Sequence, residues 1–90
     1  MILPRQIKAA RALLGLGQTE LSDLAGVGIA TLKRIEAYPE IRGAAATVWK
    51  IQSALEAAGI EFIPSEGGKG PGVRLKEPAQ PDYKLGRKGG

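Results

Sequence analysis

The stretch from Gln18 to Glu36, QTELSDLAGVGIATLKRIE, decides the fold class of this chain. It holds two segments with apolar residues at helical spacing, separated by glycines. The pattern predicts one helix over Gln18–Ala25, closed by Gly26, and a second over Gly28–Ala37. Two short helices joined by a tight, glycine-containing turn form a helix-turn-helix. We therefore place this motif at the centre of the fold.

Each of these two helices has one apolar face that we expect to point inward. Leu21 and Leu24 form that face in the first helix, and Leu32 and Ile35 form it in the second. Pro39 cannot continue a helical hydrogen-bond ladder, so the second helix must end before it.

One further helix is predicted on each side of the motif: Pro4–Leu14 before it and Ala44–Ala58 after it. Proline suits the first turn of a helix, and Gly15 and Gly59 supply the stops. The residues expected to face the core are Ile7, Ala10 and Leu14 in the earlier helix, and Val48, Ile51 and Leu55 in the later one.

The C-terminal third has a different composition. Residues 60–63 alternate weakly and contain β-branched side chains, which favours a short strand, and residues 73–75 supply a return strand after a Gly-rich loop. From residue 77 onward the chain has little to bury, and we predict a disordered basic tail. The predicted fold class is all-α: a four-helix bundle over residues 1–76 with a short C-terminal β-hairpin, followed by a disordered tail over 77–90.

The composition excludes several kinds of site. The 90 residues include no cysteine and no histidine, so disulfides, thiolate metal sites and the commonest general base are absent from the sequence. No nucleophile–base pair, metal cluster or cofactor motif is visible, so we expect neither an enzyme nor a bound cofactor or metal. No signal peptide or membrane-spanning run is visible, and we expect a cytoplasmic protein without a membrane partner.

The net charge of +4 suits a polyanionic partner such as nucleic acid, although half of that charge lies in residues 76–90. The basic tail, which includes Tyr83, has two interpretations: an arm that follows the DNA backbone, or an unstructured segment without a binding role.

The chain resembles the Cro and phage-repressor type of helix-turn-helix proteins, the XRE family, in a short single-domain branch common in alphaproteobacteria. The resemblance covers roughly residues 4–76. The matching residues stand at the family's spacings, and they are Arg11, Leu14, Leu16, Gln18, Leu21, Gly26, Val27, Thr31, Leu32 and Glu36.

The resemblance implies a transcription regulator, such as a repressor, that binds double-stranded promoter DNA with residues 28–37 in the major groove. Ile29, Ala30, Lys33 and Arg34 take the positions that face base edges and groove walls, and Thr31 adds a hydroxyl contact to the backbone. Ile29 and Ala30 can only touch a thymine methyl, so direct base readout would depend on the two cations. One such domain reads a half-site, so a homodimer is expected.

The resemblance also assigns residues outside the groove-facing set. Arg11 and Glu36 would form a structural ion pair, and Gln18 would meet a phosphate at the start of its helix. Gly28 stands where the family usually has serine or threonine, so only its backbone N–H can reach a phosphate.

Trp49 is the anomaly of the sequence. It falls on the outer face of its helix, away from the stripe of Val48, Ile51 and Leu55. It either marks a protein interface or folds over the loop at residues 38–42. The interface interpretation supports an alternative function, an antiactivator or adaptor that keeps the fold but sequesters a protein transcription activator through Trp49 or Ile29. An antidote of a toxin–antitoxin pair is a further alternative, since such proteins share the fold.

Overall fold

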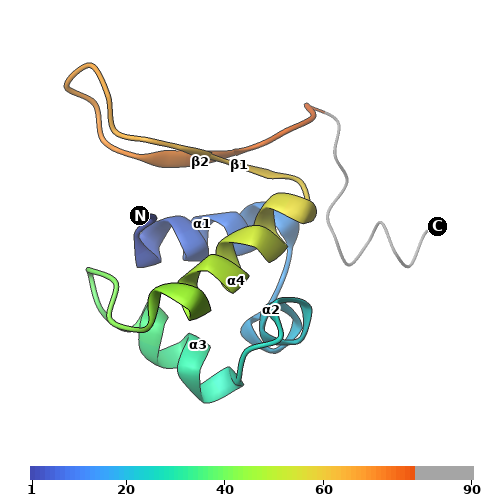
Figure 1. The fold of residues 1–90 in the computed structure, drawn as a ribbon. Helices are drawn as coiled ribbons and strands as arrows, with labels where there is room; N and C mark the ends of the chain where they lie inside the picture. The colour runs from blue at the N-terminus through green and yellow to red at the C-terminus, as the bar shows by residue number, and fades with distance from the viewer. Residues whose placement is uncertain (79–90) are drawn as a thin grey trace.

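The structure is a computed structural model that describes residues 1–78. It consists of four helices followed by an antiparallel hairpin (Figure 1). The elements are α1 (Pro4–Leu14), α2 (Gln18–Ala25), α3 (Ile29–Glu36), α4 (Ala45–Ala57), β1 (Ile60–Ile63) and β2 (Gly72–Leu75). All of the predicted helices and strands are present. The observed bounds differ from the predicted ones by at most one residue at each end. Residues 79–90 of the predicted tail lie outside the described residues.

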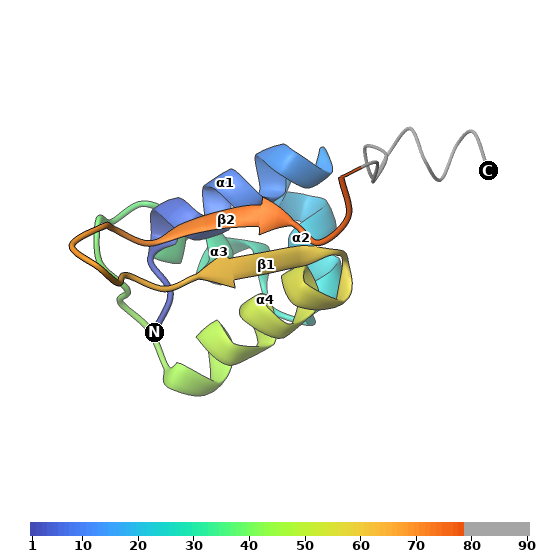
Figure 2. The same cartoon turned by 90° about the horizontal axis from the view of Figure 1, so that it is seen from above.

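The fold has three tiers. The hairpin covers one side of α1 and α4, and α2 and α3 lie on the other side (Figure 1). Seen from above, β2 runs over α1 and β1 runs over α4 (Figure 2). α3 is thus on the opposite side of the molecule from the hairpin.

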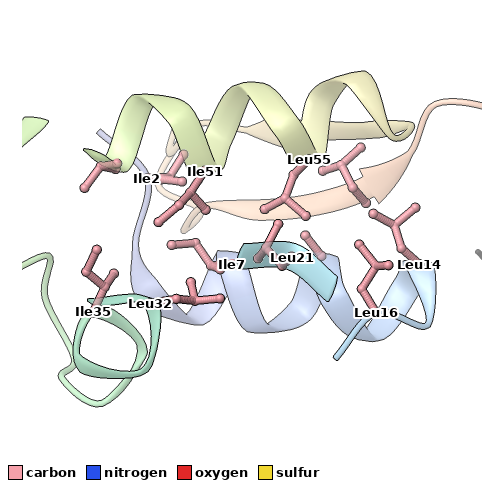
Figure 3. Packing of buried hydrophobic residues seen from close by; sticks show 12 residues of the cluster. Ile2, Ile7, Leu14, Leu16, Leu21, Leu32, Ile35, Ile51 and Leu55 are labelled. Atoms are coloured by element: carbon pink, nitrogen blue, oxygen red, sulfur yellow. The ribbon is translucent and has the colours of Figure 1, made fainter. Parts of the chain in front are cut away.

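The apolar core lies between these tiers (Figure 3). Its fully buried side chains come from all four helices and from β1, and include Ile7, Leu14, Leu21, Leu32, Ile35, Ile51, Leu55 and Ile60. The predicted inward residues of α1, α3 and α4 are confirmed.

The hairpin is part of the core, so the class all-α is too narrow. Ile60 is completely buried, and Phe62, Val73 and Leu75 pack against the core from the sheet face. The Gln6 side chain in α1 also donates a hydrogen bond to the carbonyl of Gly72 (2.9 Å). The fold is mostly helical with an integral two-stranded sheet, because four short helices leave one side of α1 and α4 without an apolar cover.

The hairpin turn is tighter than the predicted loop. Gly67 and Gly68 both have positive φ, at 60° and 77°, and Glu66 and Lys69 exchange backbone hydrogen bonds of 3.1 and 3.0 Å across them. Two successive residues with positive φ give a turn whose twist matches that of the two strands, and glycine adopts it without strain.

The prediction that Leu24 faces inward is wrong. Its side chain is 46% exposed, whereas Leu21 one turn earlier is completely buried. Leu24 borders a shallow groove whose other lining residues are Ala54, Ala57 and Ala58. These methyl groups are too short to cover a leucine.

No helix within residues 1–78 is both long enough and apolar enough to cross a membrane.

Candidate nucleic-acid interface

The turn between α2 and α3 is only three residues long, Gly26-Val27-Gly28. Gly26 adopts a left-handed conformation (φ 69°), and the N–H of Val27 bonds to the carbonyl of Ser22 at 3.1 Å. This is a Schellman-type helix end, which redirects the chain immediately after α2. Val27 then packs against the core, and Gly28 is the N-cap of α3. The orientation of α3 relative to α2 is therefore fixed.

α3 has one face in the core and one in solvent. Leu32, Ile35 and Glu36 are buried, whereas Ala30, Lys33, Arg34 and Ala37 at its end are exposed. The buried set follows the helical repeat, so the exposed set forms a continuous outer face.

The outer face of α3 carries positive charge that the described part of the chain does not neutralise. Lys33 and Arg34 are exposed, and no salt bridge within residues 1–78 involves either of them. Arg42, in the loop after α3, does have partners. It pairs with Glu40 (3.3 Å) and lies 4.3 Å from the ring centroid of Tyr38. Two exposed cations on one helix face, without a salt bridge to any other described residue, suit an anionic ligand.

The first turn of α3 adds polar groups to that face. Gly28 is the N-cap and is exposed, and no side chain caps this end of the helix. The first backbone N–H groups of a helix have no partner within the helix, so they are available to an anion. Ile29 and Thr31 are half-buried beside them.

Glu36 anchors the other end of α3 in a hydrogen-bonded cluster. Its carboxylate is 2% exposed and accepts from Nε and Nη2 of Arg11, at 2.9 and 2.8 Å. Arg11 also donates from Nη1 to the carbonyl of Leu16 at 3.1 Å. The ion pair implied by the resemblance is present, and it ties α1 to the end of α3.

Gln18 belongs to the same cluster, which the sequence did not indicate. Its side-chain amide donates to Oε1 of Glu36 at 3.1 Å. One N–H of this amide is therefore bonded to Glu36 inside the protein, and it cannot make the phosphate contact that the resemblance assigns to Gln18. No local pattern relates Gln18 to Glu36, because they meet only when the start of α2 packs beside the end of α3.

Trp49 lies on α4. Its side chain is 63% exposed. In the loop at residues 38–42, Arg42 lies over the ring of Tyr38. Ile29, the other residue considered for a protein interface, lies on α3 and is half-buried, whereas Trp49 is exposed.

Within residues 1–78 no group of three or more acidic, histidine or cysteine side chains could hold a metal ion. The chain matches no protein-family model and no curated protein, so the geometry of α2 and α3 carries the functional argument.

Proposed function

We propose that this protein is a helix-turn-helix transcription regulator that binds promoter DNA through α3. One observation carries the proposal: the outer face of α3 presents Lys33 and Arg34 without a salt bridge within residues 1–78, while its inner face is locked in the core. A rigid helix with free cations is what the major groove accommodates. The resemblance to the Cro and phage-repressor type of protein supports the same function.

In this proposal α3 enters the major groove with its outer face toward the base edges. Arg34 donates a bidentate pair of hydrogen bonds to a guanine, and Lys33 contacts a base or a phosphate nearby. Ala30 and Ile29 give apolar contact to thymine methyl groups. Thr31 hydrogen-bonds to the DNA backbone.

Two other groups would hold the register on the DNA backbone. The backbone N–H groups at Gly28 meet a phosphate at the start of α3. Gln18 keeps one amide N–H on Glu36, which leaves its second N–H for a phosphate at the start of α2. The Glu36 cluster ties the start of α2 to the end of α3, and so fixes how the two helices would approach the DNA together.

The test compares Arg34→Ala with the wild type on DNA from the protein's own upstream region and on an unrelated duplex, by fluorescence anisotropy. Losing a base contact should weaken specific binding by about 1–3 kcal/mol. Binding to the unrelated duplex should change less, since phosphate neutralisation supplies nearly all of that affinity.

The matched control is Arg5→Ala, which removes the same charge from an exposed position on α1. It should lower both affinities alike and only slightly. Circular dichroism must show native helix content in both variants. Equal binding of the upstream DNA by folded Arg34→Ala and wild-type protein would refute the proposal.

The alternative function, capture of a protein transcription activator, has one specific observation in its favour, the 63% exposure of Trp49. Under that function Trp49→Ala or Ile29→Ala would abolish activator capture, costing about 2 kcal/mol or more. Arg34→Ala would then have little effect on capture.

A further inference from the structure

The groove beside Leu24 lies between the end of α2 and the C-terminal end of α4, and we call it the Leu24 groove. All of the residues that line it are apolar, and Leu24 itself is 46% exposed. The volume of about 220 Å³ is below the roughly 300–1,000 Å³ of sites that hold a small molecule. The groove therefore suits one or two apolar side chains of a peptide segment better than a separate small ligand.

The described chain ends beside this groove. After β2, the backbone N–H of Lys76 donates to the carbonyl of Gly59 (2.9 Å), and its ammonium donates to the carbonyl of Glu56 (2.7 Å). These two carbonyls flank the last two alanines of the groove in the sequence. Figure 2 shows the end of β2 beside this end of α4. Residues 79–90 therefore start next to one wall of the groove.

The length and spacing of residues 79–90 suit the groove. Their sequence, AQPDYKLGRKGG, contains two large apolar side chains, Tyr83 and Leu85. The i, i+2 spacing places both on the same side of an extended segment. At about 3.3–3.6 Å per residue, Leu85 can lie up to about 25 Å from Pro78. The groove extends over only four residue steps of α4, about 6 Å, so both side chains are within reach of it.

The charges around the groove favour a basic segment that crosses it toward α2. Asp23 directly precedes Leu24, is exposed, and forms no salt bridge within residues 1–78. On α4, the exposed Lys50 lies one turn before the groove. A basic segment that starts at the end of α4 is therefore attracted across to α2 and not along α4. Residues 79–90 have the required charge, with cations at Lys84, Arg87 and Lys88 and one carboxylate at Asp82.

We infer that residues 83–88 dock in the Leu24 groove of their own chain. Tyr83 and Leu85 cover its apolar lining, and the cations that follow lie beside Asp23. The tail has too little apolar surface to become ordered by itself. A tethered segment needs only a weak contact, however, because its effective concentration at a nearby site is in the millimolar range. The sequence did not indicate this surface, because it predicts that Leu24 faces inward.

The docked segment lies away from the outer face of α3. α2 lies toward the end of α4, whereas α3 lies below the start of α4 (Figure 1). Docking therefore leaves Lys33 and Arg34 uncovered and holds the cations of the tail on α2. In the protein without DNA, the tail is then an intramolecular segment and not an arm free to follow the DNA backbone. The inference does not rest on the proposed function, since docking needs no DNA.

The experiment locates the tail in the full chain by paramagnetic relaxation. The sequence has no cysteine, so Gly86→Cys gives a single attachment site for a nitroxide next to Leu85. In the ¹⁵N-labelled protein without DNA, the nitroxide should broaden the amide signals of residues 23–26 and 54–58. The signals of Lys33 and Arg34 on the outer face of α3 should keep their intensity. Full intensity at residues 23–26 and 54–58 overturns the inference.

Two variants of the spin-labelled chain test the tail and the groove separately. Leu85→Ser removes an apolar side chain from the tail, and Ala57→Lys puts a cation at an exposed position in the groove. Each should lower the ratio of docked to free tail by about fivefold or more, since an apolar contact is lost. The matched controls are Gln80→Ser in the tail and Ala46→Lys at an exposed position on α4 outside the groove. Both should leave the broadening unchanged, and equal effects of variants and controls overturn the inference.

A mixed sample distinguishes docking within one chain from docking between two copies. It contains spin-labelled protein without ¹⁵N and ¹⁵N-labelled protein without a nitroxide. Docking within one chain predicts no broadening at residues 23–26 and 54–58 in this sample. Broadening there as strong as in the singly labelled chain would mean that the tail binds a second copy, and the inference would be wrong.

Promoter DNA separates the inference from the proposed function. Arg34→Ala should keep the docked tail in the free protein while it loses specific DNA binding. A docked tail in a protein that binds no DNA specifically would refute the proposed function and support the inference. If the nitroxide broadens no groove signal without DNA, and the amide signals of residues 79–90 shift only when DNA is added, the tail is a DNA arm and the inference is overturned.

Discussion

The guanidinium of Arg11 donates two hydrogen bonds to the two carboxylate oxygens of Glu36, 2.9 Å from Nε and 2.8 Å from Nη2. This fork-to-fork geometry is the strongest form of the arginine–carboxylate pair. It joins residues 25 positions apart and fixes α3 relative to α1. The orientation of the proposed recognition helix therefore depends on a contact far from its exposed face.

We expect Arg11→Ala to destabilise the protein by about 3–5 kcal/mol, because it leaves the carboxylate of Glu36 buried without its main partner. The double variant Arg11→Met with Glu36→Met should recover most of that loss, since apolar groups of similar size need no partner. Urea unfolding gives both values. If the double variant is as unstable as Arg11→Ala, packing rather than the buried charge accounts for the loss.

Shortening Leu32 to alanine should cost about 2–5 kcal/mol, because this completely buried side chain leaves a cavity between α3 and the rest of the core. Leu55→Ala should behave alike for the same reason. Leu24→Ala is the control at an exposed leucine, and should cost less than about 1 kcal/mol. Thermal melts should separate the two classes by roughly 10 °C or more in a domain of this size. Similar melting temperatures for Leu24→Ala and Leu32→Ala would contradict the packing described above.

Gly26→Ala should destabilise the protein by about 1–2 kcal/mol, the cost of a left-handed conformation for a residue with a Cβ atom. Nothing lies within 4 Å of that added Cβ, so strain of the backbone is the whole effect. Gly26→Asn should cost less, because asparagine tolerates this conformation better. Equal losses in the two variants, measured by urea unfolding, would point to a clash that the structure does not contain.

The Arg74 guanidinium hydrogen-bonds to Glu61 across the hairpin and, with its charge, lowers the pKa of that carboxyl. A lowered pKa in the folded state means that the pair stabilises the hairpin fully above the pKa of the unfolded chain. That stabilisation is lost as the pH falls through the folded value. Both side chains are largely in solvent, so the effect should be small and should weaken further with added salt.

The measurement for this pair is an NMR titration of the Glu61 carboxyl. In Arg74→Gln its pKa should rise toward the ordinary value for glutamate. Arg42→Gln, which removes the partner of Glu40 instead, should leave the pKa of Glu61 unchanged. A Glu61 titration insensitive to Arg74→Gln would show that the cross-strand bonds do not persist in solution.

The local elements of this protein could be predicted from sequence because their causes are local. Pro4 starts α1, Gly26 ends α2 in a conformation that suits glycine, and the spacing of Val48, Ile51 and Leu55 defines the inner face of α4. These signals act over one or two turns of helix, so they do not depend on what packs against them.

The tertiary structure decided the rest, since those features depend on what distant segments supply. Leu24 follows the helical repeat but is exposed, because α4 offers it only alanines. Gln18 meets Glu36 because the packing of α2 and α3 brings their ends together. A pocket lined by residues such as Leu3, Gln52 and Ile63 exists only because the N-terminal residues and the hairpin meet α4 at one place. Burial and contact across long sequence separations follow from the shapes of the packed surfaces, and no short pattern encodes them.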